Sequence, residues 1–163
     1  MYMKKSFLFL TIMVMFFVSS CERTSQEGAY IKYESDTLSI EYPRTWETEL
    51  YSYTFRPFVA ASNDQIITTG VRKKQDVTLD SFVVERINSF ESTQWGFRLL
   101  EKEIKDGKAV IKYVNEADGQ VKLGTIMHIY DYGDSFYGID CIYETEQQKD
   151  TAEYIMNSIK LKR

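Results

Sequence analysis

The stretch that decides the fold is residues 97–143, FRLLEKEIKDGKAVIKYVNEADGQVKLGTIMHIYDYGDSFYGIDCIY. Runs of β-branched and aromatic residues, which favour strands, alternate here with three glycine-containing pairs: Asp106-Gly107, Asp118-Gly119 and Tyr132-Gly133. Asp-Gly between two such runs is a strong signal for a two-residue type I′ hairpin, and Tyr-Gly is a weaker one. The stretch therefore predicts a four-stranded antiparallel meander.

Two-residue loops at these three places also predict a register. Glu101 then lies opposite Lys112, Lys112 opposite Thr125, and Thr125 opposite Asp140, all on one polar face that includes an opposite-charge pair. We expect the other face to be the core side of the sheet, because its residues are mostly apolar. They are Leu100, Ile104, Ala109, Ile111, Ile126, Tyr137, Ile139 and Cys141. Val110, Met127, Ile129 and Phe136 share the polar face, so we expect that part of it is covered as well.

Strands and helices are predicted on both sides of the meander. Alternation in 38–42, ended by Pro43, the β-prone stretch 51–61 and the stretch 65–74 predict strands. Helical spacing predicts a helix over 79–92, with Thr78 as its N-cap, and another over 146–158, where Thr145 and Gln148 have capping-box spacing. The helical stripes are Leu79, Phe82, Val83, Ile87 and Phe90 in the first helix, and Ala152, Ile155, Met156 and Ile159 at the second. Two helices and a two-sided sheet predict an α+β fold, an antiparallel sheet with helices packed on both faces.

The N-terminus is typical of a bacterial export signal, with Lys4 and Lys5 before an apolar run from Phe7 to Val18. The segment Val18-Ser19-Ser20-Cys21 resembles the lipobox of bacterial lipoproteins, which implies that Cys21 is lipidated after cleavage. A plain cleaved signal and a membrane span are the alternatives, although about fifteen apolar residues fall short of the roughly 20 that span a bilayer. We therefore expect a signal peptide over 1–20, a polar tether over 21–29 and one domain over 30–163.

The net charge disfavours one class of binding partner, and the cysteine content disfavours a disulfide within the chain. Loss of Lys4 and Lys5 leaves 18 basic and 24 acidic residues, so the mature chain carries a net charge of −6. An acidic domain without basic clusters disfavours nucleic acid as a partner. With Cys21 lipidated, Cys141 has no partner for a disulfide, and its place in an apolar strand predicts a small buried side chain.

A family resemblance covers about residues 36–161. Ile40-Glu41-Tyr42-Pro43-Arg44-Thr45-Trp46-Glu47 resembles the YPxxW opening of PsbP-like domains, which share a fold with the photosystem II extrinsic subunit and a Ran-binding nuclear import factor. Leu79-Asp80-Ser81-Phe82 and Tyr154–Lys160 look similar too. The resemblance implies an α/β/α sandwich, and it implies no catalytic or metal residue, because the plant proteins' sites have no matching motif here.

Few residues in the chain have catalytic or metal-binding potential. The register places the single histidine, His128, on the core face across from Ala109 and away from Asp140, and no serine nucleophile motif is present. Asp131-Tyr132-Gly133-Asp134 is too short for an EF-hand loop and predicts a turn. We therefore expect a structural His128, no metal site, no cofactor and no enzymatic activity.

The densest aromatic cluster of the mature chain comprises Trp46, Tyr51, Tyr53, Phe55 and Phe58. Core packing explains such a cluster, and an exposed surface for a partner or ligand is the functional alternative, since Tyr and Trp favour interfaces. Our first hypothesis is a lipid-anchored, non-enzymatic binding or assembly module of the bacterial cell envelope, with an envelope protein as partner. The second is a lipoprotein that carries a small ligand between sheet and helix or under residues 43–62.

Overall fold

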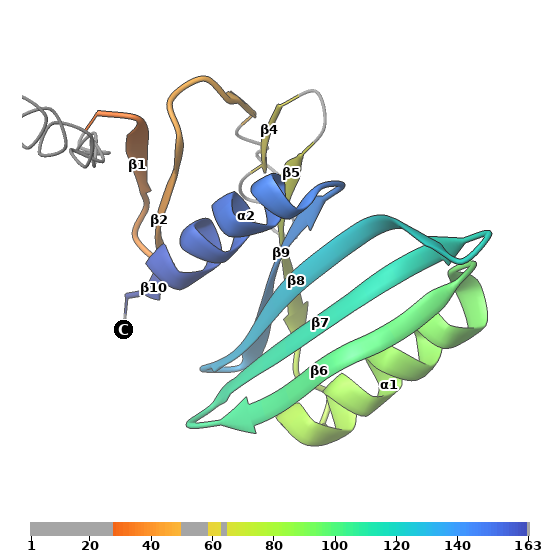
Figure 1. The fold of residues 1–163 in the computed structure, drawn as a ribbon. Helices are drawn as coiled ribbons and strands as arrows, with labels where there is room; N and C mark the ends of the chain where they lie inside the picture. Colours follow the sequence, from red (N-terminus) through yellow and green to blue (C-terminus); the bar gives the residue numbers. More distant parts are fainter. Residues whose placement is uncertain (1–27, 50–58, 63–64, 163) are drawn as a thin grey trace, which may run out of the picture.

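A computed structural model describes residues 28–49, 59–62 and 65–162. Within them, seven strands form one antiparallel sheet in the order β3-β4-β5-β9-β8-β7-β6, and three form a smaller sheet in the order β1-β2-β10 (Figure 1). The elements are β1 (Tyr30–Glu34), β2 (Leu38–Pro43), β3 (Glu47–Glu49), β4 (Val59–Ala61), β5 (Ile66–Lys73), α1 (Leu79–Thr93), β6 (Phe97–Lys105), β7 (Lys108–Ala117), β8 (Gln120–Tyr132), β9 (Ser135–Tyr143), α2 (Glu146–Ser158) and β10 (Lys160–Leu161). The predicted meander is confirmed as β6–β9, and β5, β4 and β3 extend it.

Both helices begin where their capping residues predict. The Thr78 side chain accepts a hydrogen bond from the Ser81 backbone N–H at the start of α1. At α2 the Thr145 hydroxyl accepts from the Gln148 N–H, and the Gln148 side chain accepts from the Thr145 N–H, which completes a capping box. Both apolar stripes are buried, and no helix of the described residues is both long and apolar enough to cross a bilayer.

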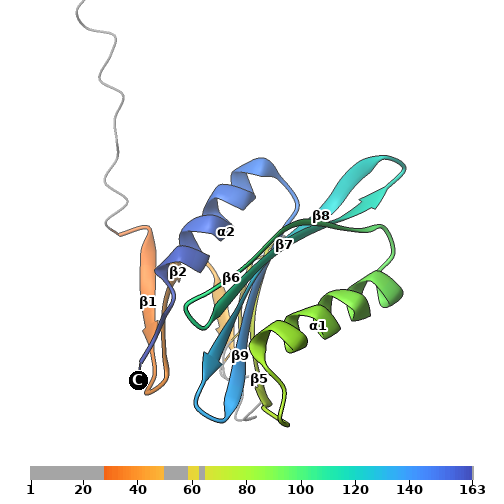
Figure 2. The ribbon, with the colours of Figure 1, turned by 90° about the horizontal axis from the view of Figure 1, so that it is seen from below.

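The helices pack on different sets of sheet residues. The stripe of α1 contacts a cluster that includes Ala109, Ile111, Met127 and Ile129. The stripe of α2 belongs to a second cluster, formed with the small sheet and with Ile126, Ile139, Cys141 and Tyr143. Successive strand residues point to opposite faces, so β8 supplies residues to both clusters. Strands are seen between the two helices in Figure 2.

The predicted register is correct for the first hairpin and wrong beyond it. Glu101 pairs with Lys112 as predicted, but Lys112 pairs with Ile126 and not with Thr125. The cause is a β-bulge on β8, because Val121 pairs with Glu116 and Leu123 with Asn115, which leaves Lys122 as an extra residue. One extra residue reverses the faces of β8 relative to β7.

The last turn is also displaced. Tyr132 pairs with Ser135, so the loop is Gly133-Asp134 rather than Tyr132-Gly133, and Thr125 pairs with Ile142 instead of Asp140.

These shifts divide the residues that we assigned to one core face. Ile104, Ala109 and Ile111 pack with α1, whereas Ile126, Ile139 and Cys141 pack with α2. Leu100 is the extra residue of a second bulge, on β6, and it is exposed rather than buried. The sheet thus has two apolar faces instead of one inner and one outer face.

Candidate binding cleft

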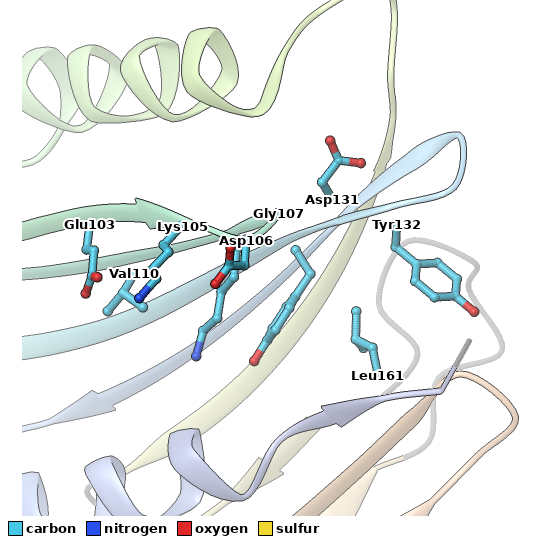
Figure 3. A pocket seen from close by; sticks show the side chains of 10 residues that line it. Glu103, Lys105, Asp106, Gly107, Val110, Asp131, Tyr132 and Leu161 are labelled. Atoms are coloured by element: carbon cyan, nitrogen blue, oxygen red, sulfur yellow. The ribbon is translucent and has the colours of Figure 1, made fainter.

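An open cleft of about 470 Å³ lies between the β6–β7 hairpin and β10 (Figure 3). We call it the hairpin cleft. Its lining residues are Glu103, Lys105, Asp106, Gly107, Lys108, Val110, Tyr130, Asp131, Tyr132 and Leu161. It lies on the sheet face that α2 packs against, where β6 and β7 extend beyond that helix.

The hairpin turn places charges of both signs at the rim of the cleft. Asp106 and Gly107 have φ values of 51° and 74°, which is the left-handed backbone of a type I′ turn, and Lys105 pairs directly with Lys108. Asp131 forms an ion pair with Lys74 of the segment after β5. The Tyr132 hydroxyl donates to the backbone carbonyl oxygen of Lys162 and so joins β8 to the C-terminal strand.

The floor of the cleft is apolar and aromatic. Lys108 lies over the ring of Tyr130, with 5.5 Å between its ammonium nitrogen and the ring centroid. Burial lowers the pKa of Lys108, while the nearby Glu103 opposes that shift. Burial also raises the pKa of Tyr130, so its phenol stays protonated and can donate a hydrogen bond at neutral pH. A lining that combines apolar and aromatic residues with polar ones is compatible with a protein-binding surface, which usually has an apolar centre and a polar rim.

A second cavity of about 230 Å³ adjoins the hairpin cleft and shares Glu103, Lys108 and Val110 with it. It contains His128, which is 3% exposed and lies between Val110 of β7 and Ile139 of β9. His128 Nδ1 is 3.3 Å from the Tyr130 hydroxyl oxygen. Burial, with smaller contributions from Lys108 and Lys112, lowers the pKa of His128 to about 3.

The position of His128 corrects one prediction and confirms another. It pairs with Val110 and not with Ala109, because the β8 bulge places it on the α2 face. It is buried, and Asp140 points to the other face, as expected, since Asp140 pairs with Met127. Among the described residues, the side chain within hydrogen-bond distance of this imidazole is a phenol, whereas a carboxylate usually orients a histidine that acts as a general base.

Lys112 connects three elements at the end of this cavity. Its ammonium nitrogen lies 3.1 Å from a carboxylate oxygen of Glu101 on β6 and 3.7 Å from one of Glu153 on α2. The hydrogen bond to Glu101 is the main reason why the pKa of Lys112 is raised. The positive charge beside His128 is therefore permanent at physiological pH.

The remaining predicted site residues lie partly outside the described residues. Trp46 is 8% exposed and belongs to the α2 cluster. Tyr51, Tyr53, Phe55, Phe58 and the predicted lipidation residue Cys21 lie outside the described ranges of the chain. Cys141 is a buried free thiol, as its strand position predicts, and burial raises its pKa to about 12.

Sequence reasoning missed Lys108 and Tyr130 as cleft residues. The two lie directly opposite each other on β7 and β8, and this pair follows only once the β8 bulge is known. Within the described residues, no three His, Cys, Asp or Glu side chains are grouped as metal ligands are.

No family model matches the chain, and no curated protein matches it. The solved structures that are similar to it include the following two. The first is cyanobacterial PsbP (CyanoP) from Synechocystis sp. PCC 6803, with a TM-score of 0.61 and 14% identity over 89% of this chain and 99% of that one. The second is LpqN, involved in cell envelope biogenesis of Mycobacterium tuberculosis, with a TM-score of 0.52 and 11% identity over 82% of this chain and 91% of that one. Likeness at this identity shows the fold alone, and the fold is PsbP-like.

Proposed function

We propose that this chain is a lipid-anchored binding or assembly module of the bacterial cell envelope, without enzymatic activity, and that an envelope protein docks in the hairpin cleft. The proposal rests chiefly on the composition of the cleft, whose lining combines Val110, Tyr130 and Leu161 with charged residues of the β6–β7 hairpin. The PsbP-like fold supports it, since LpqN has this fold and is involved in envelope biogenesis. We further propose that the layering is the α/β/α sandwich that the family resemblance implies.

The absence of enzymatic activity is supported by the surroundings of His128. Its imidazole is buried, its lowered pKa makes protonation at neutral pH unfavourable, and its close polar neighbour is Tyr130. A proton-transfer role needs a side chain with a pKa nearer to the working pH and access to a substrate. Neither CyanoP nor LpqN carries an enzymatic name.

A charge reversal tests the hairpin cleft. Lys105→Glu changes the sign of one rim residue, and Lys122→Glu is the matched control on the exposed β7–β8 hairpin. We expect that mild crosslinking in native membranes captures a partner with the wild type and the control, and much less of it with Lys105→Glu. Equal capture by all three proteins would show that the partner does not use this cleft.

The anchor is tested by lipid labelling. Cells that express the protein are grown with an alkyne fatty acid, and we expect Cys21→Ser to lose the label while Cys141→Ser keeps it. These are the two cysteines of the chain, and Cys141 is buried, so the comparison isolates the lipobox position. Equal labelling of Cys21→Ser and wild type would show that Cys21 is not the lipidated residue and would contradict the lipobox assignment.

The ligand-carrying function is a second candidate, and one observation favours it. A separate cavity lies between helix α1 and the sheet, which is one of the two places expected to hold a ligand.

A further inference from the structure

This cavity, of about 250 Å³, lies between α1 and strands β5 and β9. We call it the glycine hollow. Its lining includes Gly70 and Gly138 on the sheet, Phe82 and Arg86 on α1, and Thr68, Arg72, Met127, Ile129, Phe136 and Asp140. It is on the α1 face, whereas the hairpin cleft is on the α2 face.

The hollow exists because two glycines lie side by side in the sheet. The register aligns Ile129 of β8 with Gly138 of β9 and Gly70 of β5, so two of three neighbouring positions carry no side chain. A Cβ atom added to Gly138 would find, within 4 Å, only the Gly70 carbonyl oxygen at 3.9 Å. Larger side chains occupy the adjacent rows, with Met127, Asp140 and Thr68 at one end and Phe136 and Arg72 at the other.

The charged side chains that line the hollow differ in the contacts that they already make with other residues. Asp140 accepts a hydrogen bond of 2.7 Å from the Thr68 hydroxyl, and Arg72 lies 3.4 Å from Glu85 and over the ring of Phe82. Arg86 lies over the Phe90 ring, 4.8 Å from its centroid, and makes no ion pair within the described ranges. Its guanidinium is a planar donor suited to a carboxylate.

The walls of the hollow suit a flat apolar group. Phe82 is stacked on Phe136 with 4.6 Å between ring centroids, and Met127 and Ile129 are buried beside the glycines. Gly70 and Gly138 are half-buried, and a ring can approach their peptide planes closely because no Cβ atom intervenes.

We propose that the glycine hollow binds a small aromatic carboxylate, with the ring over Gly70 and Gly138 and the carboxylate on Arg86. The inference rests on the ligand-carrying function and is independent of a partner in the hairpin cleft.

Benzoate is the probe, titrated into the full-length chain in a non-ionic detergent, with backbone amide signals followed by NMR. We expect saturable shifts at Gly70 and Gly138, and about tenfold weaker binding of benzamide, which has the same ring without the charge. Arg86→Gln, an exposed change that leaves the core intact, should weaken benzoate binding by about tenfold or more. Lys105→Gln in the hairpin cleft is the matched control and should bind as the wild type does.

Gly138→Val tests the shape of the hollow. Valine is favoured in strands and its side chain would occupy the cavity, so we expect an unchanged or higher melting temperature together with loss of benzoate binding. If this variant fails to fold, Arg86→Gln and its control still decide the outcome.

Three results would overturn the inference. They are unsaturable shifts at the two glycines, loss of binding in Lys105→Gln but not in Arg86→Gln, and undiminished binding in a folded Gly138→Val. Equal affinity for benzamide and benzoate would refute the carboxylate assignment while retaining an apolar ligand site. Loss of benzoate binding alone leaves partner capture by the hairpin cleft unaffected, so the two proposals fail separately.

Discussion

His128 and Lys112 lie on the same face of neighbouring strands, and their surroundings keep His128 neutral and Lys112 positively charged. Burial keeps His128 neutral, while Glu101 and Glu153 keep Lys112 protonated. Neither group changes its charge between pH 5 and 8, the range in which an ordinary histidine titrates. Neither His128 nor Lys112 therefore acts as a pH switch in this range.

We predict that His128→Gln lowers the free energy of unfolding by about 1–3 kcal/mol at pH 7, as is usual for a change at a buried polar site. Partner recovery should persist wherever the variant is folded. Urea denaturation and partner capture on the same variant measure both effects. An unchanged melt with lost function would instead place His128 in a working site and contradict the non-enzymatic proposal.

Low pH should reduce the difference in unfolding free energy between the wild type and His128→Gln. The folded-state pKa of His128, about 3, lies below its ordinary value of 6.5, so the unfolded chain takes up a proton first as the pH falls. The stability that neutral His128 contributes is complete above pH 6.5 and is lost progressively towards pH 3. Unfolding free energies of both proteins at pH 7, 5.5 and 4 check this, and a constant difference would show that His128 is not shielded from protons.

At the scale of single elements, the turns and bulges decide which residues meet. Asp106-Gly107 and Asp118-Gly119 both have the left-handed φ values of type I′ turns, so local sequence specifies these hairpins. The bulge at Lys122 then reverses which face of β8 meets each helix. Strand pairing, rather than turn chemistry, therefore decides that His128 and Lys112 share a face.

Two glycines on adjacent strands should respond oppositely to alanine. A Cβ atom at Gly124 would lie 2.2 Å from the buried Tyr143 ring, whereas one at Gly138 meets only an atom 3.9 Å away. We expect Gly124→Ala to cost about 1–3 kcal/mol through overpacking. Gly138→Ala should be neutral or stabilising, because glycine is unfavourable within a strand.

Chemical denaturation of both glycine variants measures the contrast. A Gly124→Ala/Tyr143→Val double variant should cost less than the sum of its two single changes, because the shortened side chain removes the clash. Additive costs would mean that the Tyr143 ring does not press on Gly124.

The capping box of α2 should contribute measurably to stability. Thr145→Ala removes the acceptor for the Gln148 N–H and should lower the free energy of unfolding by about 1 kcal/mol. Thr151→Ala, in the interior of the same helix, is the matched control and should be neutral or stabilising, because alanine is the better helix former. Urea titrations of the two variants should therefore separate, and coincident curves would show that the cap adds nothing.

At the scale of the whole molecule, the predicted domain 30–163 contains all the described helices and strands. Both apolar clusters of the described residues lie within this range. We predict that a chain of residues 30–163 unfolds in a single cooperative transition. Thermal melts by far-UV and near-UV circular dichroism should coincide, and a chain that stays unfolded at low concentration would show that a partner or the membrane completes the fold.

The candidate sites were less predictable than the fold. Alternation along β7 and β8 placed His128 and Ile126 inside, but it could not pair Lys108 with Tyr130, because the bulge lies some residues away from both. The glycine hollow also went unseen, since Gly70 and Gly138 are 68 positions apart and only the β5–β9 pairing brings them together. The hairpin cleft and the glycine hollow both depend on contacts between strands, and a local sequence pattern cannot predict these contacts.

Local chemistry in the sequence was enough to determine where both helices begin, which of their residues are buried, and where two hairpins turn. Capping residues and Asp-Gly pairs act within a few positions of themselves, so their effect can be predicted from a short window. Tertiary structure alone decided the register beyond the first hairpin and the division of the core between α1 and α2. It also decided where the hairpin cleft and the glycine hollow form. The physical reason is that a bulge shifts every later pair by one residue, and its position follows from the packing of both faces at once.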